Sequence, residues 1–302
     1  MMRTRLMFMT AGLAAATLAL AGCSGDSGTA GGGAGGGSEG GTSAYEVASD
    51  VTLEGSPTFD AMTADGKVVI GVKEDQPGLG YLDAATGERS GFDIEIAKWT
   101  AASLGFAADA IEFKAIPSAN REASIVNGDI DYYVGTYSIT DKRKEQVGFA
   151  GPYFETGQQL LVAADNDTIT GPDDLTADTT VCSATGSTPI QNIRTNYPEV
   201  KTEEFDTYSQ CVDALADGTV DAVTTDGAIL IGYAAQRPDE LKVVGEPFST
   251  ELYGIGLPKD DDALRHFVNG MLTDGSETWS AIYDETLGQS GTTVTQPAVN
   301  DY

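Results

Sequence analysis

The stretch from Gly135 to Arg143 carries the residue types best suited to hold a small zwitterion. It reads Gly-Thr-Tyr-Ser-Ile-Thr-Asp-Lys-Arg, so a glycine, three hydroxyl groups and an arginine share one short loop that opens a helix. An apolar run, Ile130 to Val134, precedes it, and ligands of open α/β sheets bind at the carboxyl ends of such strands. Hydroxyls and free backbone N–H groups can hold both ends of a zwitterion, and a guanidinium matches a carboxylate. The loop therefore predicts a site for a small amino acid.

The composition argues against several other functions. The chain has 302 residues, 21% charged residues and a formal net charge of −29, which is typical of a soluble globular body of one or two domains. Nucleic acid needs a basic footprint, so no nucleic-acid partner is expected. The one histidine, His266, lies in an acidic helical run and is interpreted as a surface residue. We therefore expect no multi-histidine metal site and no cofactor.

The first 22 residues have the pattern of a lipoprotein signal peptide. Arg3 and Arg5 precede an apolar run that is short for a membrane span, and Leu20-Ala-Gly-Cys23 looks like a bacterial lipobox. Cleavage would leave Cys23 as a diacylated, palmitate-type anchor on the extracytoplasmic face of the cell membrane. The alternative is ordinary secretion with an incidental cysteine. Residues 23–57 are interpreted as a Gly/Ser-rich tether and a lead-in.

The body of the chain alternates apolar runs with helical patterns, which predicts an α/β fold. Asp93 and Glu95 lie in the first turn of one helix and are interpreted as partners of its dipole, not as a catalytic pair. From Gln289 onward we expect a loosely held tail. The main predicted elements are strands at 68–72, 111–116, 130–134 and 158–163, and helices at 92–104, 261–274 and 277–287.

A short internal echo predicts two similar lobes. Asn127–Asp131 precedes the loop described first, and Asp217–Asp221 precedes Asp226 in the same way. In both places a helix ends at glycine, an acidic residue follows a β-branched one, and a strand leads to polar residues. Two such lobes would each present a strand end to one cleft. The acidic residues Asp131 and Asp221 are interpreted as turn-stabilising.

The second lobe holds a polar turn and two cysteines. Thr185-Gly-Ser-Thr188 follows a strand and opens a helix, where N–H groups can face an anion. Cys182 and Cys211 are most simply a disulfide in an exported protein, and the alternative is a pair of free buried thiols. A metal or redox site is disfavoured because the sequence has no Cys-x-x-Cys motif.

Five motifs stand in order along the body of the chain. They are Gly91-Phe-Asp-Ile-Glu-Ile-Ala97, Ser138-Ile-Thr-Asp-Lys-Arg143, Pro152-Tyr153, Thr185-Gly-Ser-Thr188, and Val220-Asp-Ala-Val223 with Asp226. Together they resemble the family 3 polar amino-acid-binding proteins of bacterial ABC importers. The resemblance covers about Asp65 to Leu287. Thr100 departs from the family pattern, at a position that concerns helix packing.

This resemblance implies an α/β, two-lobed periplasmic-binding-protein-like type II fold, with a discontinuous first lobe and two hinge strands. It places the crossings near Tyr153–Gly157 and Thr250–Tyr253. The implied parts are residues 58–154 and 254–288 for lobe 1, 155–253 for lobe 2, and 289–302 for the C-terminal tail.

The resemblance also assigns the parts of the ligand. It gives the α-carboxylate to a guanidinium and the polar groups around it, which are Arg143, Ser138, Gly186, Ser187 and Thr188. It gives the α-ammonium to Asp226, aided by Thr136. Loops that resemble the glutamate- and aspartate-binding branch place Lys73, Ser118 and Arg121 at the side-chain carboxylate. The alternatives are a surface role for Arg143 and solvated loop charges at Lys73 and Arg121.

The expected function is capture of glutamate by hinge closure and its delivery to an ABC transporter permease, by a monomer that is not an enzyme. Aspartate, glutamine or asparagine are alternative ligands. A receptor module for a signalling membrane protein would use the same closed form. An enzyme of this fold is disfavoured because no general base stands out. A ligand-binding core like that of ionotropic receptors is disfavoured because the sequence shows no membrane span.

Overall fold

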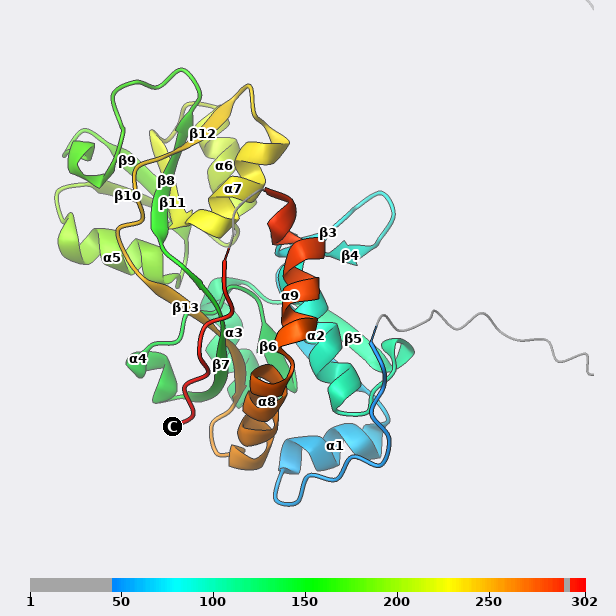
Figure 1. Cartoon of the computed structure of the whole chain (residues 1–302). Coiled ribbons are helices and arrows are strands. Elements are labelled where there is room, and N and C mark those ends of the chain that lie inside the picture. Colours follow the sequence, from blue (N-terminus) through cyan, green and yellow to red (C-terminus); the bar gives the residue numbers. More distant parts are fainter. Residues whose placement is uncertain (1–44, 291–293) are drawn as a thin grey trace, which may run out of the picture. The chain divides into compact units, whose positions relative to one another are not determined.

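The structure is a computed structural model that describes residues 45–290 and 294–302. The predicted signal peptide, Cys23 and most of the predicted tether lie outside these residues. Two five-stranded sheets and one three-stranded sheet organise the described chain (Figure 1). Across these residues, no helix combines the length and the apolarity that a membrane crossing needs.

The first sheet has the strand order β5-β1-β6-β13-β7. β1 is parallel to β5 and β6, whereas β13 is antiparallel to β6 and β7. β1 is buried along almost all of its length, which explains why its sequence is an unbroken apolar run. The strands are β1 (Val68–Val72), β5 (Ile111–Ala115), β6 (Tyr132–Val134), β7 (Val147–Thr156) and β13 (Glu251–Pro258).

The second sheet repeats this parallel arrangement in the order β10-β9-β11-β8-β12. β9 is parallel to β10 and β11, and β8 is antiparallel to β11 and β12. The strands are β8 (Gln158–Ala163), β9 (Thr180–Ala184), β10 (Lys201–Phe205), β11 (Ala222–Asp226) and β12 (Leu241–Val244). The small sheet, which follows β1, consists of β2 (Asp75–Gln76), β3 (Gly80–Leu82) and β4 (Arg89–Ser90).

Helices pack on both sheets (Figure 1). In the first part, Phe92 of α2, Phe154 of β7 and Trp279 of α9 form an aromatic core. The helices there are α1 (Pro57–Asp65), α2 (Phe92–Ser103), α3 (Arg121–Val126), α4 (Asp141–Lys144), α8 (Asp262–Asp274) and α9 (Ser276–Glu285). The second sheet carries α5 (Thr188–Asn196), α6 (Tyr208–Ala216) and α7 (Gly227–Gln236). Short 3-10 turns are η1 (Ala108–Ala110), η2 (Ser118–Asn120), η3 (Pro172–Asp174) and η4 (Leu287–Ser290).

The chain passes between the two large sheets at two adjacent places. β7 belongs to the first sheet and β8 to the second, with Gly157 between them, and β13 returns with Glu251 paired to Thr156. A Cβ on Gly157 would lie 2.4 Å from the carbonyl oxygen of Ser249, so glycine lets the two connections lie close together. This is the predicted type II fold with a discontinuous first lobe. We call the first sheet with its helices the first lobe and the second sheet with its helices the second lobe.

The acidic residues of the internal echo are structural, as predicted. The Asp131 carboxylate accepts a hydrogen bond from the backbone N–H of Val69 (2.6 Å), at the start of β1. The Asp221 carboxylate accepts one from the N–H of Thr180 (2.8 Å), at the start of β9. Each lobe therefore ties two neighbouring parallel strands together with the same device.

The disulfide and the surface histidine are also confirmed. Cys182 of β9 is bonded to Cys211 of α6, and both cysteines are fully buried. The bond joins a central strand of the second lobe to the helix that covers it. His266 is exposed and lies 3.4 Å from a carboxylate oxygen of Asp301.

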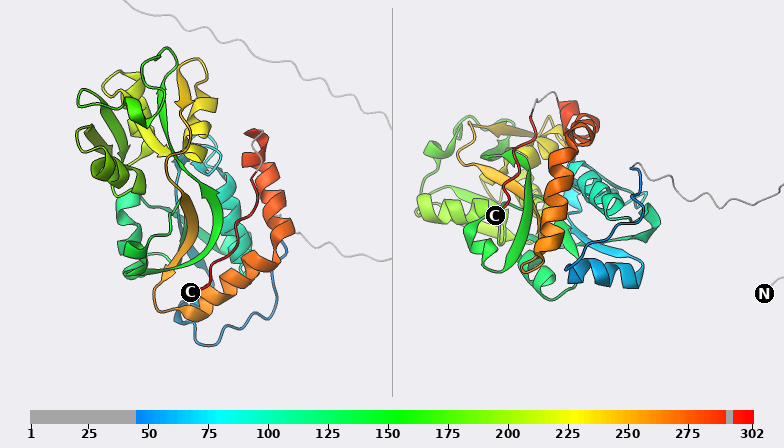
Figure 2. Two further views of the ribbon diagram at one scale, coloured as in Figure 1. Left: turned by 60° about the vertical axis from the view of Figure 1, so that its left-hand side comes forward. Right: turned by 60° about the horizontal axis from the view of Figure 1, so that its bottom comes forward.

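The prediction of a loosely held C-terminal tail is wrong for residues 294–302. The Asn300 N–H donates to the Gly151 oxygen of β7 (2.9 Å), and Gln296 donates to the Leu272 oxygen of α8 (2.7 Å). The hydroxyl of Tyr302 accepts a hydrogen bond from the N–H of Phe149 (3.0 Å). Figure 2 shows this segment running beside β7 and α8. These contacts depend on single side chains at matched positions, which the polar composition of the tail does not reveal.

Candidate functional site

Arg143 links the two lobes at the end of the Gly135–Arg143 loop. Its guanidinium donates to the backbone oxygen of Ser138 in the first lobe (2.7 Å) and to that of Gly186 in the second (3.2 Å). It also pairs with Glu122 (3.2 Å). Arg143 is buried, so the alternative of a surface arginine is wrong. Burial lowers the pKa of Arg143 to about 10, so the group stays charged at neutral pH.

Asp93 holds the loop in place from the first turn of α2. Its carboxylate accepts hydrogen bonds from the N–H of Thr136 (2.9 Å) and from the hydroxyl of Tyr153 (2.8 Å). Thr136 has a φ of 46°, a left-handed conformation that non-glycine residues keep only when the surroundings fix it. Burial raises the pKa of Asp93 to about 6. The prediction of a simple dipole partner is therefore wrong for Asp93, because the side chain is buried and supports the site.

Lys73, Ser118 and Arg121 meet as predicted. The Lys73 ammonium donates to the Ser118 hydroxyl (2.8 Å), and Arg121 donates to the backbone oxygens of Ser118 (3.1 Å), Thr136 (3.3 Å) and Gly186 (3.5 Å). Lys73 is 5% exposed and Arg121 is 2% exposed, so they are not solvated loop charges. Neither forms an ion pair with any carboxylate of residues 45–290 and 294–302. Burial, and then Arg121, lower the pKa of Lys73 to about 7.

The polar turn of the second lobe comes close to these cations. Gly186 has a φ of 76°, and a Cβ there would lie 2.8 Å from the Cα of Ala119 in the first lobe. The Thr188 hydroxyl lies 3.3 Å from that of Ser138 and donates to Glu251 (2.9 Å). Only a glycine allows the turn to approach the first lobe this closely.

Ser187 differs from its neighbours in this turn. Its hydroxyl caps α5 by accepting from the N–H of Ile190 (3.3 Å), and its own N–H donates to the oxygen of Ala184 (3.1 Å). Both groups therefore have partners within the second lobe. The structure gives Ser187 a role in holding the turn, while Gly186 and Thr188 face the first lobe.

Asp226 ends β11 and is almost fully buried. One carboxylate oxygen accepts a hydrogen bond from the Tyr253 hydroxyl (2.6 Å), and the other has no partner among the described residues. Burial, and then the charge of Glu251, raise the pKa of Asp226 to about 7. Tyr253 also forms a β-bridge with Ser138, which connects Asp226 to the loop of the first lobe.

The structure adds three polar residues that the sequence reasoning did not assign to the site. Gln76 accepts from the Thr136 hydroxyl (3.2 Å), and its buried side-chain nitrogen has no partner among the described residues. Glu251 is buried next to Thr188, and Tyr253 holds Asp226. Gln76 lies in β2, and the other two residues lie in β13. Nothing in their sequence neighbourhood indicates which way these side chains point.

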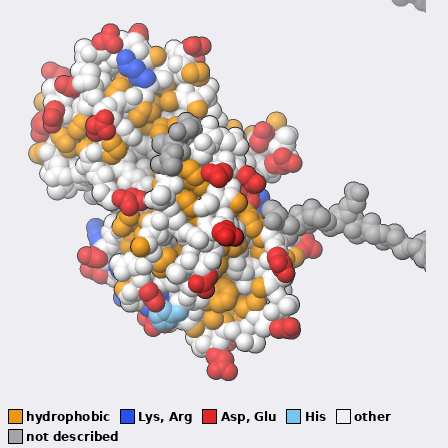
Figure 3. Space-filling view, viewed as in Figure 1, with side chains coloured by type: hydrophobic (Ala, Val, Ile, Leu, Met, Phe, Trp, Pro, Cys, Tyr) orange, Lys and Arg blue, Asp and Glu red, His pale blue; other side chains and the backbone are white. Residues whose placement is uncertain are grey.

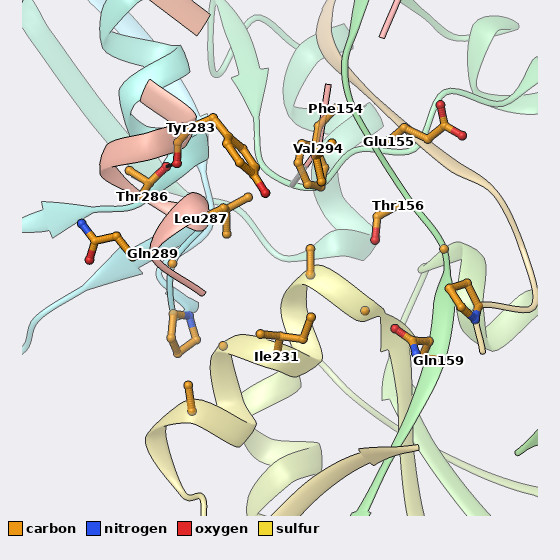
Figure 4. Close-up of a pocket in the computed structure, with 18 of the residues that line it drawn as sticks. Phe154, Glu155, Thr156, Gln159, Ile231, Tyr283, Thr286, Leu287, Gln289 and Val294 are labelled. Carbon is orange, nitrogen blue, oxygen red and sulfur yellow. Dashed lines mark hydrogen bonds between the residues drawn. The ribbon is translucent and has the colours of Figure 1, made fainter. Parts of the chain in front are cut away.

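A cavity of about 980 Å³ lies beside the hinge, away from the predicted ligand residues. Figure 4 shows Tyr283 and Leu287 on one side, Phe154 and Thr156 of β7 across from them, and Ile231 of α7 on a third side. None of the predicted ligand residues lines it, and its described lining holds one charged residue, Glu155. A zwitterion needs opposite charges placed close together, and the described lining of this cavity does not provide them.

The fold and the site together define a two-lobed binding protein. Residues 68–289 match the model of the bacterial extracellular solute-binding proteins, family 3. The chain belongs to this family.

Curated relatives in this family include proteins named for two different ligands. The chain is 42% identical to the glutamate-binding protein GluB of Corynebacterium efficiens, over 82% of this chain and 88% of the relative. It is 41% identical to a glutamine-binding protein of Geobacillus stearothermophilus, over 80% of this chain and 87% of the relative. Among solved structures, it resembles an ancestral arginine-binding protein bound to arginine, with 35% identity and a TM-score of 0.69. The match covers 74% of this chain and 99% of that one.

Proposed function

We propose that this chain is an extracytoplasmic binding protein that captures L-glutamate between its two lobes and delivers it to an ABC transporter permease. The observation that carries the proposal is the pair of buried cations, Lys73 and Arg121, that have no carboxylate partner among the described residues. A buried charge without a partner is costly. A side-chain carboxylate of the ligand supplies the partner that these cations lack.

In this proposal the amino-acid core binds between Arg143 and Asp226. Arg143 is buried and charged, and the hydroxyls of Ser138 and Thr188 lie 3.3 Å from each other beside it. The free oxygen of Asp226 accepts the α-ammonium, with the Thr136 hydroxyl as a second acceptor. The N–H groups of the turn at Gly186 add donors for the α-carboxylate. The proposed action is binding, without a covalent step.

The relatives named for glutamate and glutamine support a ligand with a three-carbon side chain that ends in a carboxylate or an amide. We choose glutamate because the Arg121 guanidinium and the Lys73 amine, which can take up a proton near pH 7, are buried in the same place. Gln76 contributes a neutral donor that suits either ligand, because its side-chain nitrogen has no partner among the described residues.

The test replaces Arg121 with methionine, which keeps an unbranched stem and removes the guanidinium and its charge. We expect glutamate affinity to fall by roughly a hundredfold or more, because a buried ligand charge loses its partner at several kcal/mol. Glutamine affinity should fall by about tenfold, the effect of one neutral hydrogen bond. Titration calorimetry with both ligands measures the two losses.

The matched control is Lys242→Met, which removes an equally sized charge from an exposed ion pair with Asp167. It should change neither affinity. Equal losses of glutamate and glutamine in Arg121→Met would contradict the assignment of Arg121 to the side-chain carboxylate. No binding of any common amino acid to the unaltered protein would overturn the proposed function itself.

We also propose that Cys23 carries the lipid that keeps the protein at the outer side of the cell membrane. The support is the lipobox at Leu20–Cys23 and the Gly/Ser-rich tether that follows it. We propose that the anchored protein is a monomer. Release from isolated membranes by detergent but not by high salt is the behaviour expected of such an anchor, and release by salt alone would contradict it.

A further inference from the structure

The hairpin that follows β1 reaches from the first lobe to the second, beside the ligand residues but apart from them. The carboxylate of Asp75 accepts a hydrogen bond from the backbone N–H of Ser209 in α6 (3.1 Å). The hydroxyl of Tyr233 in α7 donates to the backbone oxygen of Asp75 and lies 3.2 Å from its carboxylate. One residue of the first lobe thus bonds two helices of the second.

These bonds are not needed to build the helices that receive them. The N–H of Ser209 is one of the first-turn donors of α6 that have no acceptor within the helix. α6 has its own N-terminal contact, since the N–H of Thr207 donates to the Gln210 side chain (3.2 Å). A carboxylate at a helix N-terminus is favourable. Here it comes from the other lobe, so the bond forms only when the lobes are together.

A close backbone contact lies next to these bonds. A Cβ on Gly232, in the middle of α7, would lie 2.3 Å from the carbonyl oxygen of Pro77. Glycine inside a helix is less favourable than alanine, yet any other residue here would collide with the first lobe. Both residues lie at the edge of the hinge cavity, where Figure 4 shows α7 facing the first lobe.

We infer that Asp75, Pro77, Tyr233 and Gly232 form a latch that stabilises the closed arrangement of the lobes. The latch raises ligand affinity without touching the ligand. It contains none of the residues assigned to the ligand, and each of its contacts joins the first lobe to the second. The inference rests on the proposed capture of an amino acid by closure.

The decisive variant is Gly232→Ala, with L-glutamate and L-glutamine as the probes. The added methyl group blocks closure, so both affinities should fall by more than tenfold. The melting temperature of the ligand-free protein should stay or rise, because alanine favours a helix. The matched control is Gly270→Ala in α8, where a Cβ would meet nothing within 4 Å; it should leave both affinities unchanged.

Two further variants test the hydrogen bonds. Asp75→Ala and Tyr233→Phe should each lower both affinities by roughly three- to a hundredfold, the effect of one hydrogen bond to a charged group at most. Their combined effect should be smaller than the product of the two, since they share a contact.

Unchanged affinity in Gly232→Ala would overturn the latch, and so would a loss of affinity accompanied by a lower melting temperature of the ligand-free protein. Failure of the unaltered protein to bind either amino acid would instead overturn the proposed function. The two failures are thus distinguishable.

Discussion

Asp226 and Lys73 stand at opposite ends of the proposed ligand, and burial acts on them in opposite directions. It raises the pKa of Asp226 to about 7 and lowers that of Lys73 to about 7. Each group is therefore about half ionised at pH 7, and a ligand group of opposite charge favours its ionised form. The site is therefore sensitive to pH on both sides of pH 7.

Glutamate affinity should pass through a maximum near pH 7. Binding of the α-ammonium requires ionised Asp226. Below pH 7 Asp226 is mostly protonated and must release its proton before the ligand binds, so the affinity falls as the pH decreases. Binding of the side-chain carboxylate requires protonated Lys73. Above pH 7 Lys73 is mostly neutral and must take up a proton when the ligand binds, so the affinity falls as the pH increases. Each limb should approach tenfold per pH unit, and calorimetry from pH 5 to pH 9 measures both.

Glutamine serves as the control ligand for this profile. It has the same ammonium and no side-chain charge, so the acid limb should persist and the alkaline limb should flatten. Lys73→Met should flatten the alkaline limb for glutamate as well. Identical profiles for the two ligands would contradict the role of Lys73.

For single residues, the sequence predicts which charged groups the site uses, but not which residues hold these groups in place. Arg143 and Asp226 are recognisable because a zwitterion needs a guanidinium and a carboxylate at the ends of strands. Asp93 is not, because its role follows from being buried against Thr136 and Tyr153. The contacts of Asp75 and Gly232 are with residues of the other lobe, so they exist only in the folded chain. Contacts between residues far apart in the sequence leave no pattern in the local sequence.

At the scale of elements, the disulfide between β9 and α6 holds the second lobe together. It closes a loop with a sequence separation of 29 residues, which restricts the unfolded chain and stabilises the fold by about 3–4 kcal/mol. Cys182→Ala should lower the free energy of unfolding by about that amount, plus a smaller loss of packing because the sulfur is fully buried. Urea denaturation measures it.

The matched variants are Cys211→Ala and the double replacement. Each single change breaks the same bond, so the double variant should lose little more than either one. Additive losses would mean that the cysteines stabilise the lobe by packing alone, and would contradict the prediction.

The elements themselves were largely predictable from the sequence, because their patterns are local. Strand β1 and helices α8 and α9 lie within a few residues of the predicted ranges. The hairpin of β2 and β3 is not among the predicted elements, since its strands have only two and three residues. Short strands form by pairing, and their pairing partners do not appear in a local pattern.

In the whole chain, the two lobes touch through the residues proposed to bind the ligand and through the proposed latch. Lys73, Arg121 and Arg143 are buried close together in this arrangement. Their mutual repulsion and loss of hydration oppose closure when no anion lies between them. We therefore expect the ligand-free protein to populate a more open arrangement, and glutamate to draw the lobes together.

Small-angle scattering with and without glutamate measures this closure as a decrease in the radius of gyration. The formal net charge is −29, and Figure 3 shows acidic side chains over much of the visible face with few basic ones. Repulsion between molecules would distort scattering at low salt, so the measurement belongs at about 0.15 M salt, where charges are screened beyond about 8 Å.

Gly232→Ala provides the control for closure, because its methyl group collides with Pro77 only when the lobes meet. Its radius should stay large when glutamate is added, while that of Gly270→Ala should shrink as in the unaltered protein. A radius that glutamate leaves unchanged in the unaltered protein, at a concentration where calorimetry reports saturation, would contradict capture by closure. The buried cations would then have to be compensated within a site that is already closed.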